Sequence, residues 1–367
     1  MADIALLWGS EEDEAIRWPP ERQTVPPKPP PSFQVGTSTR KRTGEHLRSS
    51  PHWGKDEMLR VCSINVCSTA NGATVKTTTP VREGGLTHDQ IVSLSYNMRA
   101  CGAHIVCLQQ LNLFSKEYEE LCDLLGGEWS SIASHNGEMR MSSGALSGLA
   151  VFSRYPIERC EVVEVYDKAL GMEDVHRRAF MACEVRVAQG QSINVVNVCF
   201  EEVWEKFRIS QLERVHKMLR MLWPGFCEKG FVLAGALNGL VREDYSDGAW
   251  DFEVFERDRK RNMGAIIEAP KEQFMRQVLG AEGYRDVRKE AGYSMVFEDG
   301  AKVEASGRHD VRTDYILLSK SLGWHCPHEC YDVLPPPQHT YNCHHIILCE
   351  LAVGGVHSRP PTEHEGR

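Results

Sequence analysis

Short apolar runs separated by polar turns recur along most of the chain. Runs of four to eight residues that are continuously apolar, or rich in Val and Ile, are typical of buried strands. Such runs predict strands at residues 59–66, 104–109, 148–153, 179–187, 192–198, 231–235, 314–319 and 345–351.

Apolar residues at helical spacing predict three helices. The segment Thr87-His88-Asp89-Gln90 has the form of a capping box, and apolar residues follow it at positions 91, 94 and 98. A second helix is expected to open at Ser115, and a third to cover residues 203–222. The apolar side of this third helix is Phe207, Leu212, Val215, Leu219 and Leu222, and its basic residues Arg208, Arg214, Lys217 and Arg220 are expected to form a solvated face.

Helices that alternate with strands, together with strands that follow one another directly, indicate mixed sheets with helices on their outer sides. The chain has 367 residues, and its apolar fraction of 41% is sufficient for a sizeable core. The sequence holds no apolar run of about 18 residues, so we expect no transmembrane segment. A net charge of −9 argues against a strongly basic nucleic-acid coat, although it leaves a local positive groove open.

The cysteines and the termini bear on compartment and organisation. The 13 cysteines include several inside apolar runs, which favours buried free thiols in a reducing compartment over a disulfide framework. The acidic first residues fit neither a secretory signal nor a transit peptide, so a cytoplasmic or nuclear location is expected. Residues 1–55 are predicted to form a disordered proline-rich arm, residues 56–353 one domain, and residues 354–367 a flexible tail.

The arm carries a proline run at residues 26–31 and a basic cluster at residues 40–42. The proline run is interpreted either as a ligand for an SH3-type partner or as a solvated spacer. The basic cluster is too short to identify a nuclear signal, and a solvated run of charge is the simpler interpretation.

Several predicted strands carry polar residues in a recognisable order. The segments are LRVCSINV around Asn65, HIVCLQQL around Gln110, INVVNV before Cys199, FVLAGALN around Asn238, and RTDYILLS followed by NCHHIILCEL. Together with SGLAVFSRYPI at residues 147–157, they resemble the endonuclease/exonuclease/phosphatase superfamily of DNase I-like, metal-dependent hydrolases. The resemblance covers residues 59–351 and implies a four-layer α/β/β/α sandwich, with the site at one end of two packed sheets.

The resemblance implies functional positions, of which this sequence keeps four. Asn65, Asn238, Asp314 and His344 match the superfamily, which implies that Asp314 orients a catalytic His344 and that the two Asn side chains position water and substrate.

Four other positions depart from the superfamily pattern. Gln110 stands where a metal-binding Glu is usual, Cys199 replaces His or Tyr, and Ala236 replaces a water-activating Asp. Cys343 replaces the Asp of the final Ser-Asp-His motif. Three of these departures remove a carboxylate, and Mg²⁺ gains most of its binding from anionic oxygen ligands. We therefore expect weak or absent Mg²⁺ binding and a catalytically weakened or silent protein, a pseudoenzyme that retains phosphate-ester binding.

Two alternatives remain open at this stage. Glu243, Asp244 and Asp247 follow the altered motif closely and are either solvated acids or substitute metal ligands of an active phosphodiesterase or phosphatase. The protein is alternatively a non-catalytic interaction scaffold that binds partners through its proline-rich arm. The substrate class, nucleic acid or phosphoinositide, is not specified by these motifs, and the charged stretch 241–311 is the expected place for specificity elements.

A second group of metal-binding residue types lies near the end of the domain. Cys326, Cys330, His339 and Cys343 have the spacing C-x3-C-x8-H-x3-C, and thiolate and imidazole groups suit Zn²⁺. The spacing matches no familiar zinc finger, so packed or surface Cys and His residues are the simpler interpretation.

Overall fold

The computed structural model describes residues 58–66, 86–113, 116–140, 146–165, 178–188, 191–201, 205–248, 250, 272–292, 312–334 and 344–353. Contacts divide the chain into Met1–Thr37 and Ser38–Arg367, and every described residue belongs to the second unit. The predictions for the arm at 1–55 and the tail at 354–367 fall outside the described residues.

The first sheet has seven strands in the order β11-β13-β1-β2-β4-β3, with β12 also paired to β13. Strand β1 runs parallel to β2, and the other neighbours are antiparallel, so the sheet is mixed. Its strands are β1 (Leu59–Asn65), β2 (Ile105–Asn112), β3 (Ser130–Arg140), β4 (Leu146–Ser153), β11 (Trp324–His325), β12 (Tyr331–Leu334) and β13 (Ile346–Val353).

The second sheet has six strands in the order β5-β6-β7-β8-β10-β9. Here β7 and β8 are parallel and the other pairs are antiparallel. Its strands are β5 (Ile157–Val165), β6 (Arg178–Ala188), β7 (Gln191–Cys199), β8 (Val232–Ala236), β9 (Arg285–Asp286) and β10 (Asp314–Leu318).

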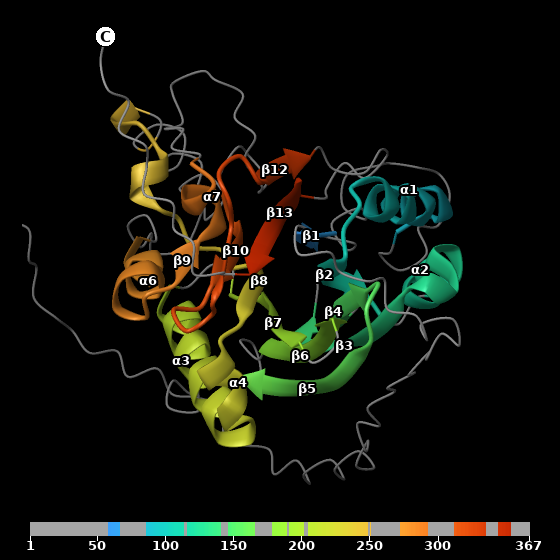
Figure 1. Ribbon diagram of the computed structural model, residues 1–367, viewed down its shortest axis with the longest axis horizontal. Helices are drawn as coiled ribbons and strands as arrows, with labels where there is room; N and C mark the ends of the chain where they lie inside the picture. The colour runs from blue at the N-terminus through green and yellow to red at the C-terminus, as the bar shows by residue number, and fades with distance from the viewer. Residues whose placement is uncertain are drawn as a thin grey trace, which may run out of the picture. The chain divides into compact units, whose positions relative to one another are not determined.

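The helices cover the outer faces of the two sheets (Figure 1). Helices α1 (His88–Ala100) and α2 (Glu117–Leu125) pack against the first sheet through an apolar cluster that includes Leu94, Leu121 and Phe152. The second sheet is covered by α3 (Glu205–Leu222), α4 (Pro224–Lys229) and α6 (Glu272–Arg276). Short turns complete the described elements: η2 (Gly126–Glu128), η4 (Arg242–Asp244), η6 (Gln277–Ala281) and α7 (Val287–Glu290).

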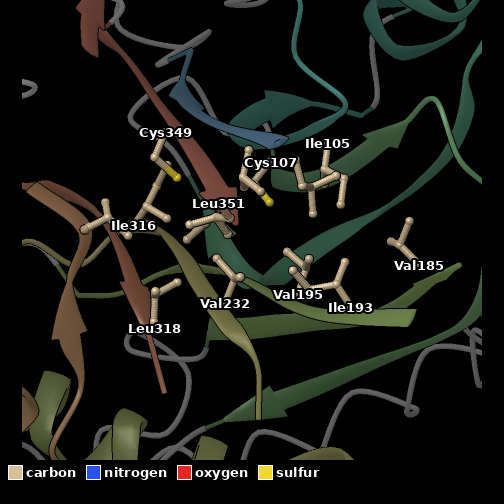
Figure 2. Close-up of a cluster of buried hydrophobic side chains, with 14 of the residues drawn as sticks. Ile105, Cys107, Val185, Ile193, Val195, Val232, Ile316, Leu318, Cys349 and Leu351 are labelled. Carbon is tan, nitrogen blue, oxygen red and sulfur yellow. The ribbon is translucent and has the colours of Figure 1, made fainter. Parts of the chain in front are cut away.

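A third apolar cluster lies between the sheets. Figure 2 shows residues of the first sheet, such as Cys107 and Leu351, facing residues of the second, such as Val195 and Val232. Because one core separates the sheets and two others separate each sheet from its helices, the fold is a four-layer α/β/β/α sandwich, as predicted.

Local sequence explains where the elements begin. Helix α1 starts with the predicted capping box: the Thr87 side chain accepts the N–H of Gln90, and the Gln90 side chain accepts the N–H of Thr87. Helix α2 starts at Glu117 after Lys116, which provides no side-chain cap; Ser115 lies outside the described residues.

Two expectations for α3 are wrong. Leu222 is 42% exposed because it stands at the last turn of the helix, beyond the sheet that covers the rest of the apolar side. Arg208 is fully buried and donates to the Glu201 carbonyl, so it is not part of a solvated basic face. Within the described residues, no helix combines the length and the apolar character that crossing a bilayer requires.

Candidate functional site

Three of the predicted site residues lie side by side in the second sheet. Strand pairing places Cys199 of β7 opposite Ala236 of β8, and Ala236 opposite Asp314 of β10. All three are buried. The register therefore brings three of the residues singled out in the sequence next to one another.

The first sheet supplies the other half of the site. Asn65 ends β1 opposite Gln109, so Gln110 is the next residue along the neighbouring strand. The backbone N–H of His344, just before β13, donates to the Asn65 carbonyl at 3.0 Å. Asn65, Gln110 and His344 thus meet at one end of the sheet.

Two contacts join the halves across the sandwich. The His344 ring nitrogen Nδ1 lies 2.6 Å from Asp314 Oδ2, and both side chains are buried. The Gln110 amide nitrogen lies 3.7 Å from the Cys199 sulfur. Thr313 adds a hydroxyl that donates to Asp314 Oδ2 at 3.1 Å. The Asp314–His344 pair predicted from the motifs is therefore formed.

Asn238 is positioned by the backbone around it. Its N–H donates to the Thr313 carbonyl at 3.0 Å, and its side-chain amide donates to the Phe200 carbonyl at 2.9 Å. Gly235, three residues before Asn238, has φ +142°, and a Cβ atom there would lie 1.9 Å from the Val198 carbonyl oxygen. Glycine is therefore required for β8 to approach β7 at this site.

The backbone is strained at two of these positions. Gln110 and Asn238 have φ values of 56° and 54°, in the left-handed region that residues other than glycine rarely adopt. Gln110 occupies an irregularity in the pairing of β2 with β4, where the register shifts between Gln109 and Leu111. Strained residues and bulges concentrate at functional sites, so the distortion supports this end of the sandwich as the site.

A buried polar network behind the site was not predicted. The Gln109 amide nitrogen donates to Asn197 Oδ1 at 2.8 Å, and the Asn197 amide donates to the carbonyls of Leu108 and Ala150, both at 2.9 Å. Gln109 and Asn197 are fully buried and come from different sheets. The available signal was the presence of polar residues inside strands that are otherwise continuously apolar, because such residues need internal hydrogen bonds.

A buried ion pair beside the site was also missed. Arg178, the first residue of β6, contacts the Glu201 carboxylate at 2.8 Å, and Arg208 donates to the Glu201 carbonyl at 2.9 Å. Glu201 follows Phe200, which binds Asn238, so this cluster adjoins the site. The ion pair could not be predicted from the sequence, because the two arginines lie on a strand and a helix that come together only in the folded protein.

Comparison with solved structures identifies the architecture. A Bacteroides vulgatus endonuclease/exonuclease/phosphatase is 15% identical, with a TM-score of 0.52 over 81% of this chain and 99% of that one. The human Nocturnin catalytic domain with bound sulfate anion is 14% identical, with a TM-score of 0.52 over 80% of this chain and 93% of that one. A mannosyl-6-phosphatase from Bacteroides thetaiotaomicron is 14% identical, with a TM-score of 0.50 over 80% and 99%.

The chain has the endonuclease/exonuclease/phosphatase fold. At this level of identity the likeness establishes the fold, in agreement with the expected architecture. No protein-family model matches the sequence, and no curated protein matches it significantly.

The described side chains at this end of the fold are poorly suited to a magnesium ion. Gln110 offers an amide, Cys199 a buried thiol and Ala236 no donor, while Asp314 Oδ2 is engaged by His344 and Thr313. Mg²⁺ is held by one or more carboxylates in octahedral geometry. Within the described part of the chain, no three His, Cys, Asp or Glu side chains come close enough to hold a metal ion.

The three acids proposed as substitute ligands are placed differently from one another. The Asp244 carboxylate is buried and contacts Arg312 at 3.1 Å and Arg288 at 3.2 Å, so two guanidinium groups already neutralise it. Asp247 pairs with Arg242 on the surface, and Glu243 is exposed. Two guanidinium groups at the buried acid disfavour cation binding there.

The structure describes two of the four residues proposed for zinc, Cys326 and Cys330. The Cys326 thiol lies 3.4 Å from the Cys330 carbonyl oxygen, so these two residues are neighbours. Burial raises the pKa of the Cys326 thiol to about 12. His339 and Cys343 lie outside the described residues.

Proposed function

We propose that this protein is a divergent member of the endonuclease/exonuclease/phosphatase superfamily that binds phosphate esters but hydrolyses them far more slowly than an intact enzyme of this fold. The observation that carries the proposal is the convergence of Gln110, Cys199 and Ala236 on the Asp314–His344 pair. The retained pair and the altered positions belong to one site.

The loss of negative charge accounts for the lost chemistry. Two unit charges about 4 Å apart interact by roughly 4 kcal/mol at an effective dielectric constant near 20. Because Gln110 stands in place of Glu and Ala236 in place of Asp, two such attractions for a divalent ion are missing. Without Asp at position 236, the attacking water also lacks a base, which costs roughly 10²–10⁴ in rate.

The retained groups support binding of an oxyanion. Asp314 lies against Nδ1 of the His344 ring and fixes its orientation, so Nε2 is the ring nitrogen that would contact a phosphoryl oxygen. Two structural neighbours are consistent with this chemistry. One, the Nocturnin catalytic domain, has a bound sulfate anion, and another is a mannosyl-6-phosphatase.

Calorimetric titration tests the proposal. We expect the natural protein to show no saturable Mg²⁺ binding at micromolar concentration and almost no hydrolysis of bis(p-nitrophenyl) phosphate. The double variant Gln110→Glu with Ala236→Asp restores both carboxylates and should gain Mg²⁺ affinity by tenfold or more. Binding of bis(p-nitrophenyl) phosphate to the natural protein, lost in His344→Ala, should be measurable without metal.

A control is Gln191→Glu, because it adds a single carboxylate at the far end of β7 on an exposed residue. It should leave Mg²⁺ affinity unchanged. Micromolar Mg²⁺ binding by the natural protein, with hydrolysis abolished by His344→Ala, would show that the protein is an active enzyme and contradict the proposal.

A further inference from the structure

Two cysteines face each other on neighbouring strands of the second sheet. Cys160 of β5 is paired directly with Cys183 of β6, and the Cys183 sulfur lies 3.4 Å from the Cys160 sulfur. Both thiols are free. Residues directly opposite in an antiparallel pair have Cα atoms about 4.5 or 5.5 Å apart, within the range of about 4.4–6.8 Å that disulfides require.

The surroundings allow an oxidant to reach one member of the pair. Strand β5 is the edge strand of its sheet, and Cys160 is half-buried. Cys183 is fully buried and belongs to the core between the sheets, against which Cys160 also packs. Both side chains therefore lie on the inner face of the sheet, with the partly exposed residue beside the fully buried one.

We propose that Cys160 and Cys183 are a redox modification site that a peroxide oxidises to a reversible cross-strand disulfide. The two sulfur atoms need only to approach from 3.4 Å to about 2.05 Å, and their strands are already in register. The proposal is independent of the chemistry at Asp314 and His344.

The reaction proceeds in two balanced steps. The Cys160 thiol attacks hydrogen peroxide, the O–O bond breaks, and Cys160 becomes a sulfenic acid as one water is released. The Cys183 sulfur then attacks the Cys160 sulfur, the S–O bond breaks, and a second water leaves with the Cys183 proton. Two thiols are oxidised by two electrons and one peroxide is reduced to two waters.

The structural consequence is a covalent link between the edge strand and its only sheet partner among the described strands. A disulfide here closes a loop of roughly 20 residues, which restricts the unfolded chain. Oxidation should therefore raise the midpoint of thermal unfolding, by roughly 5 °C for a domain of this size.

Peptide mapping tests the proposal on the full chain. The folded protein is treated with hydrogen peroxide, alkylated and cleaved with trypsin without reduction. Cys160 and Cys183 then lie in separate peptides, residues 160–168 and 179–186, each with a single cysteine. We expect a cross-linked pair two hydrogens lighter than the separate peptides, which dithiothreitol separates again.

Variants decide whether the link is specific. Cys160→Ser should abolish both the cross-link and the rise in melting temperature, whereas Cys227→Ser, which removes a half-buried thiol elsewhere, should retain both. Recovery of Cys160 as a sulfinic acid with Cys183 unmodified would overturn the proposal, as would a cross-link formed only in urea.

Discussion

Gln110 and Asn238 show how single residues adapt to the ends of strands. Both adopt left-handed backbone, where a side chain normally crowds its own peptide group. Asn tolerates this conformation better than most residues, whereas Gln does not. The strain at Gln110 therefore has to be outweighed by its contacts, such as the one with the Cys199 sulfur. The irregular pairing of β2 with β4 accommodates the left-handed backbone at this residue.

Substitution at Gln110 should expose this strain. Gln110→Gly should raise the free energy of unfolding by about 0.5–1 kcal/mol, because glycine adopts positive φ without steric cost. Gln110→Val should lower it by more than about 1 kcal/mol, because a β-branched residue is the least suited to this backbone. Urea denaturation of both variants measures the difference, and equal stability would show that the backbone at position 110 is relaxed.

At the scale of elements, periodic apolar runs were sufficient for most predictions. Each predicted strand is confirmed within a few residues of its ends, and α1 begins at the predicted capping box. Strand β3 was missed because its sequence, SSIASHNGEMR, has little apolar pattern and depends on pairing with β4. Strand β5 was missed although it pairs along its whole length with β6.

The capping box of α1 makes a prediction about that helix. Thr87→Ala removes the hydroxyl that accepts the Gln90 N–H and should lower the free energy of unfolding by about 1 kcal/mol. Thr87→Ser keeps the hydroxyl and should lower the free energy of unfolding by only about a few tenths of a kcal/mol. Chemical denaturation followed by circular dichroism distinguishes the two variants; equal losses would show that the cap contributes nothing.

At the scale of the whole domain, a buried ion cluster fixes the strand that carries Asp314. Arg312 contacts Asp286 through two hydrogen bonds of 2.7 Å and Asp244 at 3.1 Å, and it lies two residues before Asp314. Asp286 caps α7, and Asp244 lies in η4 after β8. The cluster therefore joins η4, the β9–α7 turn and the segment just before β10, the strand that begins with Asp314.

Removing the central charge should be costly. Arg312→Met removes the guanidinium partner of the buried Asp286 and leaves the buried Asp244 with Arg288 alone, so it should lower the free energy of unfolding by about 3–5 kcal/mol. The control Arg186→Met breaks an exposed pair with Glu158 and should cost less than about 1 kcal/mol. Thermal unfolding of both variants provides the comparison, and losses of similar size would contradict the role given to the cluster.

The same cluster should make stability depend on pH. Burial alone would raise the pKa of Asp286, but Arg312 and the Arg288 N–H outweigh it and hold that pKa below its usual range. Because the pKa of Asp286 is lower in the folded protein than in the unfolded chain, where it is about 3.9, ionised Asp286 stabilises the folded protein above about pH 3.9. This stabilisation is lost as the pH falls below that value and Asp286 becomes protonated. Asp286→Asn should flatten this acid limb of the stability profile, measured by denaturation between pH 3 and pH 6.

The sequence by itself determined the strands and main helices and the order of the motifs. These features depend on local periodicity and residue identity. Tertiary structure decided which side chains meet: the alignment of Cys199, Ala236 and Asp314 across three strands, the burial of Arg208, and the pairing of Asp244 with arginines. Strand register and sheet packing set these contacts between residues far apart in the chain, and no local pattern encodes them.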